Sequence, residues 1–596
     1  MVNEQQLEAF LSVKSAYQTK VMPKSNTITF LSNETGMSQI WRLNEEGEAV
    51  RYGELHDVVR NYYHSPNGDC TIAEVDTDGN EKNQLYLIEE NGNKITPLVV
   101  EPKYFHEFGG WSPDGQKISF SSNRRHPGFF DVFIMDLATG EINTVFENDG
   151  NCTPLSWLSD GEHILLEFPT TNIDSEIYKL NIASGDLVRI GVENKDARYK
   201  SLALKPGHEE GFVLTDIDAE TMYVAYFSMD KPNELIKVTH DVKWDMEELK
   251  LSPNGEKFLY TLNEAGFSRL ILCDTVSSEV KEIPGLLRGV VSSLAWVSDD
   301  EFVFAMKSPK CPGDIWKYNL NSEQLKRITF FSENPEIEHL WVDPETRIFT
   351  SFDGRGIPYL YYGKVEGSNK PAVIYVHGGP ENQTKGEYYG GIQYLVSQGF
   401  AVVTPNIRGS NGYGRTYIKL DDRRKRMDAV RDLAALNKHL AEAHQVDPKR
   451  IGIYGISYGG YMTLSSITHF PELWKVAVDL VGMSNLRTFL EKTGPWRRKL
   501  RSSEYGTLEE DTTYFDEIAP LNLAENVQTP LLVFHGQNDS RVPINESEQM
   551  VNKLKELGKE VEYIVFPNEG HVTHKVENKV REYSELVKFM IHHLTK

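Results

Sequence analysis

Cysteine is scarce in this sequence, and no segment has the features of an export signal or a membrane span. The 596 residues include four cysteines, which lie far apart and form no Cys-x-x-Cys pair. This pattern argues against a zinc site or a disulfide framework and favours a reduced, cytoplasmic setting. The N-terminus has no basic and apolar leader, and no run approaches the ~18 apolar residues needed to cross a bilayer.

Positive charge is also in short supply. Lys and Arg number 63 against 87 Asp and Glu, which gives a formal net charge of −24. Such a surface repels nucleic acid and anionic membranes, so neither is an expected partner. It also gives little reason to expect acidic substrates, unless a local basic pocket receives them. The length exceeds what one hydrophobic core supports, so at least two domains are expected.

The first ~330 residues repeat with a period of ~46, in the range typical of propeller blades. The marker of each unit is a Ser-Pro-Asp-Gly-like turn followed by an apolar strand, as at residues 112–120. Seven such turns centre on Pro23, Pro66, Pro113, Ser159, Pro206, Pro253 and Ser298. Radial repetition of short strands predicts a seven-bladed β-propeller over residues 19–335, with an irregular β-sandwich as the alternative.

The segments on either side of the repeat have different patterns. Residues 3–18 predict a capped helix, which would fill a segment 1–18 outside the blades and pack on the second domain. From 336 to 596, strand patterns alternate with helical ones, which predicts an α/β domain with a mostly parallel sheet. The predicted strands are 372–376, 401–404, 451–454, 476–480, 531–535 and 561–566.

The most specific motif is Gly-Ile-Ser-Tyr-Gly at residues 455–459, directly after the predicted strand 451–454. A Gly-x-Ser-x-Gly sequence between a strand and a helix is typical of the nucleophile elbow of α/β hydrolases. The serine stands in a strained turn, and the flanking glycines let neighbouring backbones approach closely enough to tolerate it. We therefore predict that Ser457 is a nucleophile.

A serine nucleophile needs a base, and the base needs a carboxylate that orients it. In α/β hydrolases the two partners follow the serine in the order Asp, His, each on a loop after a strand. The strand at 531–535 runs into Asp539, and the strand at 561–566 runs into His571. Ser457, Asp539 and His571 are therefore the predicted catalytic triad.

Three neighbouring groups are weaker candidates for the triad. Asp479 lies within a predicted strand rather than on a loop. His574 is one helical turn past His571 and is expected to be exposed. His535 ends a strand before a glycine and is expected to have a structural role.

Acyl transfer also needs N–H donors for the developing oxyanion. One is expected from the backbone amide of Tyr458, which follows the nucleophile. The other is expected from His-Gly-Gly-Pro at 377–380, where Gly379 is favoured because glycine allows its N–H to face the cavity. A tight turn without catalytic function is the alternative for this motif.

Two further motifs are interpreted as non-catalytic. The glycine-rich segment 409–414 does not have the spacing of a phosphate-binding loop, so we interpret it as a shaped loop near the site. The basic run 423–426 is interpreted as the solvated start of a helix.

With these motifs in place, the chain resembles the prolyl oligopeptidase family, and within it the acylaminoacyl peptidase branch. The resemblance covers essentially the whole length and rests on motifs at 377–380, 406–410, 455–460, 535–543 and 569–571. It implies a short N-terminal helix, a seven-bladed propeller and a C-terminal α/β-hydrolase domain. It also implies an enzyme that releases N-acylated residues from short peptides, often hydrolyses esters, needs no metal or organic cofactor and often forms a homo-oligomer.

The resemblance also implies where the substrate binds. Acylaminoacyl peptidases bind a substrate carbonyl through an arginine two residues after the triad aspartate, and Arg541 has that position here. A structural ion pair is the alternative for this arginine. The apolar specificity pocket is expected from the insertion that ends at Tyr505, with Phe489, Trp496 and Tyr505 as its walls.

Other functions stay open on the sequence alone. Dipeptidyl peptidases of the same family hold a free N-terminal amine with two glutamates, and no convincing pair stands out here. A carboxylesterase would differ from a peptidase in its ratio of amide to ester turnover. An interaction scaffold would carry an inert hydrolase domain, which the complete triad argues against. The domain order also predicts a size filter, in which the propeller admits only short peptides to the catalytic face.

Overall fold

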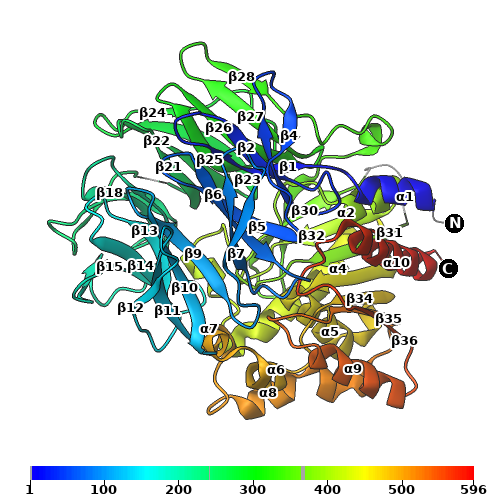
Figure 1. Ribbon diagram of the computed structural model, residues 1–596. Helices are drawn as coiled ribbons and strands as arrows, with labels where there is room; N and C mark the ends of the chain where they lie inside the picture. The colour runs from blue at the N-terminus through cyan, green and yellow to red at the C-terminus, as the bar shows by residue number, and fades with distance from the viewer. Residues whose placement is uncertain (1–2, 241, 364–368, 596) are drawn as a thin grey trace.

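The computed structural model describes residues 3–240, 242–363 and 369–595. An N-terminal array of antiparallel sheets lies beside a C-terminal domain in which helices cover a large sheet (Figure 1). None of the described helices combines the length and the apolar character that a bilayer span requires.

Seven four-stranded antiparallel sheets form the N-terminal domain, and each is built from four strands consecutive in the chain. The first three are β1 (Ala16–Val21), β2 (Ile28–Ser32), β3 (Gln39–Leu43) and β4 (Ala49–Arg51); β5 (Val58–His64), β6 (Cys70–Asp76), β7 (Gln84–Glu89) and β8 (Ile95–Val99); β9 (His106–Trp111), β10 (Lys117–His126), β11 (Phe129–Asp136) and β12 (Ile142–Phe146). The next two are β13 (Thr153–Trp157), β14 (His163–Pro169), β15 (Ser175–Asn181) and β16 (Leu187–Ile190); β17 (Tyr199–Leu204), β18 (Glu210–Thr215), β19 (Tyr223–Ser228) and β20 (Leu235–Lys237). The last two are β21 (Met246–Leu251), β22 (Lys257–Glu264), β23 (Phe267–Asp274) and β24 (Val280–Glu282); β25 (Val290–Ser298), β26 (Glu301–Ser308), β27 (Cys311–Asn319) and β28 (Gln324–Arg327).

This arrangement confirms the predicted seven-bladed propeller. Each predicted turn lies between the first and second strands of a blade, except that Ser298 is the last residue of β25. Neighbouring blades bury apolar side chains against one another: Ile72 of the second blade shares a cluster with Ile118 and Phe120 of the third. The expected boundary near residue 335 falls in the connection between β28 and β29.

An eight-stranded sheet forms the centre of the C-terminal domain, in the order β29-β30-β32-β31-β33-β34-β35-β36. Pairing is antiparallel from β29 to β32 and parallel from there on. The strands are β29 (Glu345–Thr350), β30 (Gly356–Tyr362), β31 (Lys370–Val376), β32 (Ala401–Pro405), β33 (Val446–Ile456), β34 (Val476–Leu480), β35 (Leu531–Gly536) and β36 (Val561–Phe566). The described helices are α1 (Glu4–Leu11), α2 (Gly390–Ser397), α3 (Arg415–Ile418), α4 (Arg426–Ala443), α5 (Tyr458–His469), α6 (Leu486–Lys492), α7 (Pro495–Tyr505), α8 (Thr512–Ile518), α9 (Asn545–Glu556), α10 (Val576–Leu594) and the short 3-10 helices η1 (Glu338–Leu340), η2 (Arg423–Lys425), η3 (Pro471–Leu473) and η4 (Pro520–Asn526).

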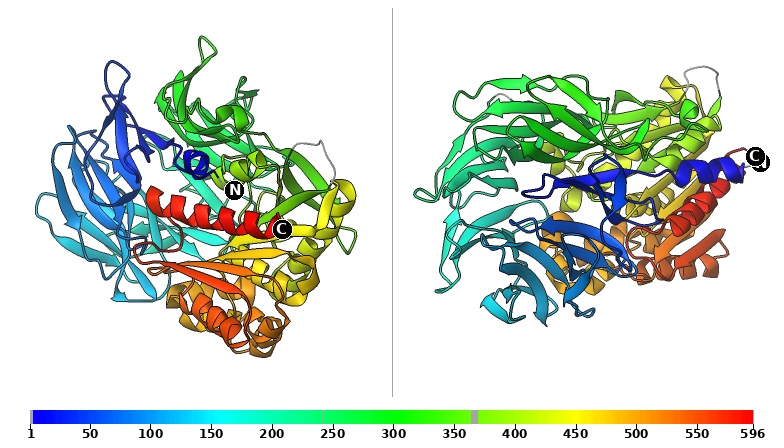
Figure 2. Two further views of the ribbon diagram at one scale, coloured as in Figure 1. Left: turned by 90° about the vertical axis from the view of Figure 1, so that its right-hand side faces the viewer. Right: turned by 45° about the horizontal axis from the view of Figure 1, so that its top comes forward.

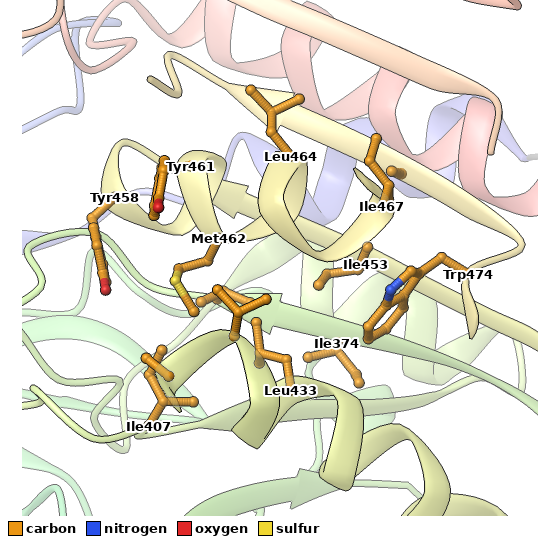
Figure 3. Packing of buried hydrophobic residues seen from close by; sticks show 14 of the residues in the cluster. Ile374, Ile407, Leu433, Ile453, Tyr458, Tyr461, Met462, Leu464, Ile467 and Trp474 are labelled. Atoms are coloured by element: carbon orange, nitrogen blue, oxygen red, sulfur yellow. The ribbon is translucent and has the colours of Figure 1, made fainter. Parts of the chain in front are cut away.

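The sheet has an apolar core on both faces because alternate residues of each strand point in opposite directions. Ile374 and Ile453 belong to the cluster that α4, α5 and α9 cover, and Figure 3 shows them packed with Leu433 and Met462. Val373, next to Ile374, belongs to the opposite cluster, which α1, α2 and α10 cover. Because β31 to β36 pair in parallel, their carboxyl ends meet at one edge of the sheet.

The N-terminal helix shares an apolar cluster with α2 and α10 of the C-terminal domain, and it is shorter than predicted. Helix α1 ends at Leu11, and the N–H of Ser12 caps it through the carbonyl of Glu8. The chain then extends and enters β1 at Ala16, so the predicted helix to residue 18 and the blade boundary at 19 are both too late. Residues 16–21 instead pair with β2, and a helix to residue 18 would have left that edge of β2 without its partner strand.

Replacing Phe10 with alanine should destabilise the catalytic domain by about 3–5 kcal/mol, because the ring is fully buried between α1 and Tyr394. Urea unfolding of the purified variant would measure this change. Glu8→Ala is the matched control, since Glu8 lies on the exposed side of the same helix and should change stability by less than about 0.5 kcal/mol. Equal midpoints for the two variants would contradict a packing role for α1.

Candidate active site

The Gly-x-Ser-x-Gly motif forms a tight turn between β33 and α5. Ser457 has φ 59° and ψ −116°, a strained conformation for a residue with a side chain. A methyl group added to Gly455 would lie 2.2 Å from the carbonyl oxygen of Gly459. One added to Gly459 would lie 2.0 Å from the carbonyl oxygen of Val376 in β31. Glycine is therefore required at both positions for the turn to close against the neighbouring strand.

The three side chains predicted as a triad lie in one hydrogen-bonded series. Nε2 of His571 is 2.9 Å from Oγ of Ser457, and its Nδ1 is 2.7 Å from Oδ2 of Asp539. The Asp539 side chain is fully buried and that of His571 is 6% exposed. An ionised carboxylate only accepts hydrogen bonds, so Nδ1 carries the proton and Nε2 accepts from the serine hydroxyl.

Asp539 has the surroundings of an ionised carboxylate. Its Oδ1 accepts backbone N–H groups from Arg541 at 2.7 Å and Val542 at 2.9 Å. Burial alone would raise the pKa of Asp539, but the charge and hydrogen bonds of His571 and His535 outweigh it and lower the pKa below its ordinary value. His535 is fully buried, with Nδ1 2.7 Å from Oγ of Ser547 and Nε2 3.5 Å from Oδ2 of Asp539, so it supports the carboxylate from the side away from Ser457.

The two remaining competitors lie outside this series. Asp479 is buried in β34, where burial raises the pKa of its carboxyl to about 7, and it has no hydrogen bond to the three side chains. His574 was expected to be exposed, and this expectation is wrong. Its ring is half-buried, with Nε2 2.6 Å from Nη1 of Arg60 in the propeller, because the domain interface covers it.

Both backbone groups expected to bind an oxyanion lie close to Ser457. Tyr458 is the first residue of α5, so its N–H has no acceptor within the helix. Gly378 and Gly379 line the pocket in front of Ser457, and Gly379 has φ 126°, which favours glycine. The glycine-rich segment 409–414 supports the 377–380 motif, since Oγ of Ser410 is 2.9 Å from Nε2 of His377.

A buried ionic network lies behind Tyr458. The Tyr458 hydroxyl donates to Oδ2 of Asp421 at 2.7 Å, and Arg426 donates to the carbonyl of Glu504 at 2.7 Å. Arg426 is 0% exposed and stacks on Tyr505 at 4.4 Å. The interpretation of residues 423–426 as solvated is therefore wrong for Arg426, because Asp421 and Glu504 compensate its charge in the interior.

Three carboxylates of this network could in principle hold a cation. One oxygen each of Asp421, Asp422 and Glu504 lies within 4.8 Å of the others. Arg426 forms ion pairs with Asp421 and Glu504, so the cluster already contains a positive charge.

A pocket of about 500 Å³ opens in front of Ser457. Trp496 and Tyr505 of α7 line it, as expected from the sequence. Phe489 does not: it is 1% exposed and lies behind the wall, against Tyr505 and the guanidinium of Arg501. Three arginines, Arg497, Arg501 and Arg541, also line this pocket, which the sequence-based expectation of apolar walls did not include.

Arg541 lines this pocket and also forms an ion pair with the propeller. Its Nε lies 2.7 Å from Oε1 of Glu81, whose other oxygen accepts from Ser540 at 2.6 Å and from Arg497 at 3.1 Å. Burial alone would raise the pKa of Glu81, but the two arginines and Ser540 lower it to about 2. Arg541 thus has the structural ion pair that the sequence left as an alternative, and 44% of its side chain stays exposed.

Glu81 belongs to the hairpin loop 77–83 between β6 and β7, which contacts the loops that carry Asp539 and His571. Nδ2 of Asn538 donates to the carbonyl of Asp78 at 3.0 Å, beside Asp539. A methyl group on Gly79 would lie 2.3 Å from the backbone nitrogen of Gly570, so the two backbones touch. The propeller therefore contacts the loops on either side of the predicted base and its carboxylate.

Sequence reasoning missed several charged residues of the site. Arg497 and Arg501 are four residues apart on α7 and both line the pocket. The concentration of basic residues at 497–501 was a usable signal, although the interpretation relied on the aromatic residues of that segment. Glu381 also lines the pocket and accepts from Asn172 at 2.7 Å. Nothing local marks Glu81, because its partners lie 416 to 460 positions away.

The chain is similar to known peptidases in both sequence and structure. Residues 387–596 match the model of the prolyl oligopeptidase family. Dipeptidyl aminopeptidase BIII of Pseudoxanthomonas mexicana is 23% identical over 94% of this chain and 84% of its own length. An acylamino-acid-releasing enzyme of Arabidopsis thaliana is 30% identical over 35% of this chain and 28% of its own length. A puromycin-hydrolyzing peptidase of Mycobacterium tuberculosis superposes with a TM-score of 0.86 at 18% identity, over 99% of this chain and 96% of that structure.

Glu81→Gln should destabilise the protein by about 1–2 kcal/mol at pH 7. This is less than for a fully buried ion pair, because Arg541 is partly exposed to solvent. The pKa of Glu81 is about 2 in the folded state against an ordinary 4.5, so its contribution is complete above pH 4.5 and is lost as the pH falls towards 2. Urea unfolding of both proteins between pH 7 and pH 3 would measure this.

The difference in stability between wild type and Glu81→Gln should therefore shrink on acidification. Glu89→Gln is the matched control, because its ion pair with Lys94 is exposed on β7 and should contribute less than about 0.5 kcal/mol. A difference for Glu81→Gln that does not change with pH would contradict the assigned ion pair.

Proposed function

Because this chain belongs, through its C-terminal domain, to the prolyl oligopeptidase family of serine peptidases, we propose that it hydrolyses short peptides with an acylated N-terminus. The product on the acyl side would be the N-acylated amino acid, and esters of the same acids would also be substrates. The relatives include enzymes named for releasing acylamino acids, which supports this assignment.

The proposed mechanism is a two-step acyl transfer. His571 takes the proton of Ser457 through Nε2, and the serine oxygen attacks the substrate carbonyl. Asp539 holds the imidazole in the required tautomer and stabilises its positive charge. His571 then protonates the leaving amine, and a water molecule, activated by the same imidazole, hydrolyses the acyl-enzyme.

The developing oxyanion is assigned to the backbone amides of Tyr458 and Gly379. Each such donor contributes about 3–4 kcal/mol to the stabilisation of a transition state when it is already oriented. The ion pairs behind Tyr458 support this orientation, because they fix the first turn of α5 through the tyrosine hydroxyl.

The charge of the pocket is the observation that carries the preference for a blocked N-terminus. Arg497, Arg501 and Arg541 line it, and they would repel the ammonium group of a free N-terminus. Glu81 is already bound to two arginines and Ser540. Burial raises the pKa of Glu381, which favours its neutral form and weakens it as an anchor for an amine.

A dipeptidyl peptidase is the second candidate, and two observations favour it. A relative that matches 94% of this chain is a dipeptidyl aminopeptidase. Glu381 lines the pocket, and its hydrogen bond to Asn172 leaves room for a second donor. A free amine bound close to Glu381 would lower the pKa of that carboxyl and hold it ionised.

A carboxylesterase and an interaction scaffold remain as alternatives, and simple measurements separate them. An esterase would turn over p-nitrophenyl esters and show negligible activity on the matching anilides. A scaffold would not react with a fluorophosphonate probe, which labels activated serines. The cytoplasmic location and the homo-oligomer expected from the sequence stay predictions.

Wild type should cleave acetyl-alanyl p-nitroanilide at least about tenfold better, in kcat/KM, than alanyl-alanyl p-nitroanilide, because the arginines disfavour the ammonium group. Ser457→Ala should lower both activities by at least about 10³-fold. Ser322→Ala, an exposed propeller serine, serves as the control and should match wild type. A preference for the free amine would transfer the assignment to the dipeptidyl peptidases.

The enzyme should also cleave short acetylated peptides in strong preference to long chains. The propeller contacts the loops of Asp539 and His571, so a substrate has to fit between the two domains. Liquid chromatography of digests of an acetylated octapeptide and of denatured casein, at equal peptide-bond concentration, would compare the rates. Comparable cleavage of both would rule out a size filter.

A further inference from the structure

Arg501 presents unused hydrogen-bond donors to the pocket. Its Nη1 donates to Oγ1 of Thr493 at 2.6 Å and to the carbonyl of Arg541 at 3.0 Å, which fixes the guanidinium beside the Asp539 loop. Its Nε and Nη2 have no hydrogen-bond partner among the described residues, and neither is among the fully enclosed polar atoms. These two groups form the fork with which an arginine binds both oxygens of a carboxylate.

The charge of Arg501 also lacks a direct counterion within the described part of the chain. Arg497 and Arg541 share Glu81, whereas no carboxylate oxygen lies within 4.0 Å of the Arg501 guanidinium. Asp539 attracts it from farther away, but the oxygens of Asp539 already accept from His571 and two backbone amides. A half-buried cation without a counterion is unfavourable, and burial accordingly lowers the pKa of Arg501.

We infer that the pocket recognises a carboxylate on the substrate and that Arg501 is the residue that binds it. The inference rests on the proposed function only for the presence of a scissile peptide bond near Ser457. The same helix supplies Trp496, Leu500 and Tyr505 to the lining, so apolar surface surrounds the guanidinium and strengthens its attraction for an anion.

A carboxylate can reach Arg501 from two parts of a peptide. It can be the side chain of a glutamate or aspartate on the acyl side of the scissile bond. Alternatively, it can be the free C-terminal carboxylate of a very short leaving group. Both have the same planar pair of oxygens, so the geometry of Arg501 suits both and substrates must distinguish them.

Two pairs of substrates separate these sources. The first pair is acetyl-glutamyl and acetyl-glutaminyl p-nitroanilide, which differ only in the charge of the side chain. The second is acetyl-alanyl-alanine and its C-terminal amide, which differ only in the charge of the leaving group. Wild type should prefer the charged member of one pair by about tenfold or more in kcat/KM.

Arg501→Gln should reduce that preference to within about threefold of unity, and Arg501→Lys should keep part of it because the charge remains. Lys499→Gln is the matched control: it removes one positive charge from the same helix, on its exposed side, and should keep the wild-type preference. The ratio within each pair is the readout, so a general loss of activity in a variant cancels.

The outcomes also separate this inference from the proposed function. If only substrates with a free amine are cleaved, the proposed function fails, and alanyl-glutamyl and alanyl-glutaminyl p-nitroanilide then test the carboxylate preference. If wild type cleaves the charged member of every pair no better than the uncharged member, in kcat/KM, the inference is overturned without any variant. A preference that Arg501→Gln leaves intact overturns the assignment to Arg501.

Discussion

The contact between one propeller hairpin and two loops of the catalytic domain is the constraint on which the site depends. Glu81 binds Arg541 in the loop of Asp539, and Gly79 touches Gly570 next to His571. Loops are ordinarily the most mobile parts of a domain, whereas acid–base chemistry needs its groups held within about 0.5 Å of their productive positions. Within the hydrolase domain the two loops bond to each other, through the N–H of Asn538 and the carbonyl of Glu569, and the propeller adds contacts from the other side. The propeller is therefore part of the site's framework.

The serine side of the site is held from within the catalytic domain. The strained backbone of Ser457 persists because the sheet and α5 close around it without room for other side chains. Behind it, Asp421 and Arg426 fix the hydroxyl of Tyr458, and Tyr505 packs on the same guanidinium. Breaking a buried ion pair is costly, so this network favours one arrangement of the elbow. It also couples the amide assigned to the oxyanion with a wall of the pocket.

Features that depend on local sequence could be predicted, and those that depend on contacts between distant segments could not. Each blade turn and the elbow at 455–459 follow from a few adjacent residues, and the triad order follows from strands that end in loops. Arg426 was misinterpreted because Glu504, one of its two acidic partners, lies 78 positions away and helps to bury it. Glu81 has no local signal, since its role arises only when the domains meet. The predicted N-terminal helix was too long because strand pairing from Ala16 outweighs helix propensity.

The net charge of −24 and the arginines of the pocket act over different distances. At physiological ionic strength, screening limits exposed charges to a range of about 8 Å, so the acidic surface mainly slows the approach of an anionic peptide. Inside the pocket, Arg501 acts by direct hydrogen bonds in surroundings of lower dielectric, where screening is weak. Selection for a carboxylate therefore occurs after entry and acts on how long a substrate stays bound, while the acidic exterior limits how often one arrives. An acidic protein can in this way bind an acidic group without any basic surface to attract it.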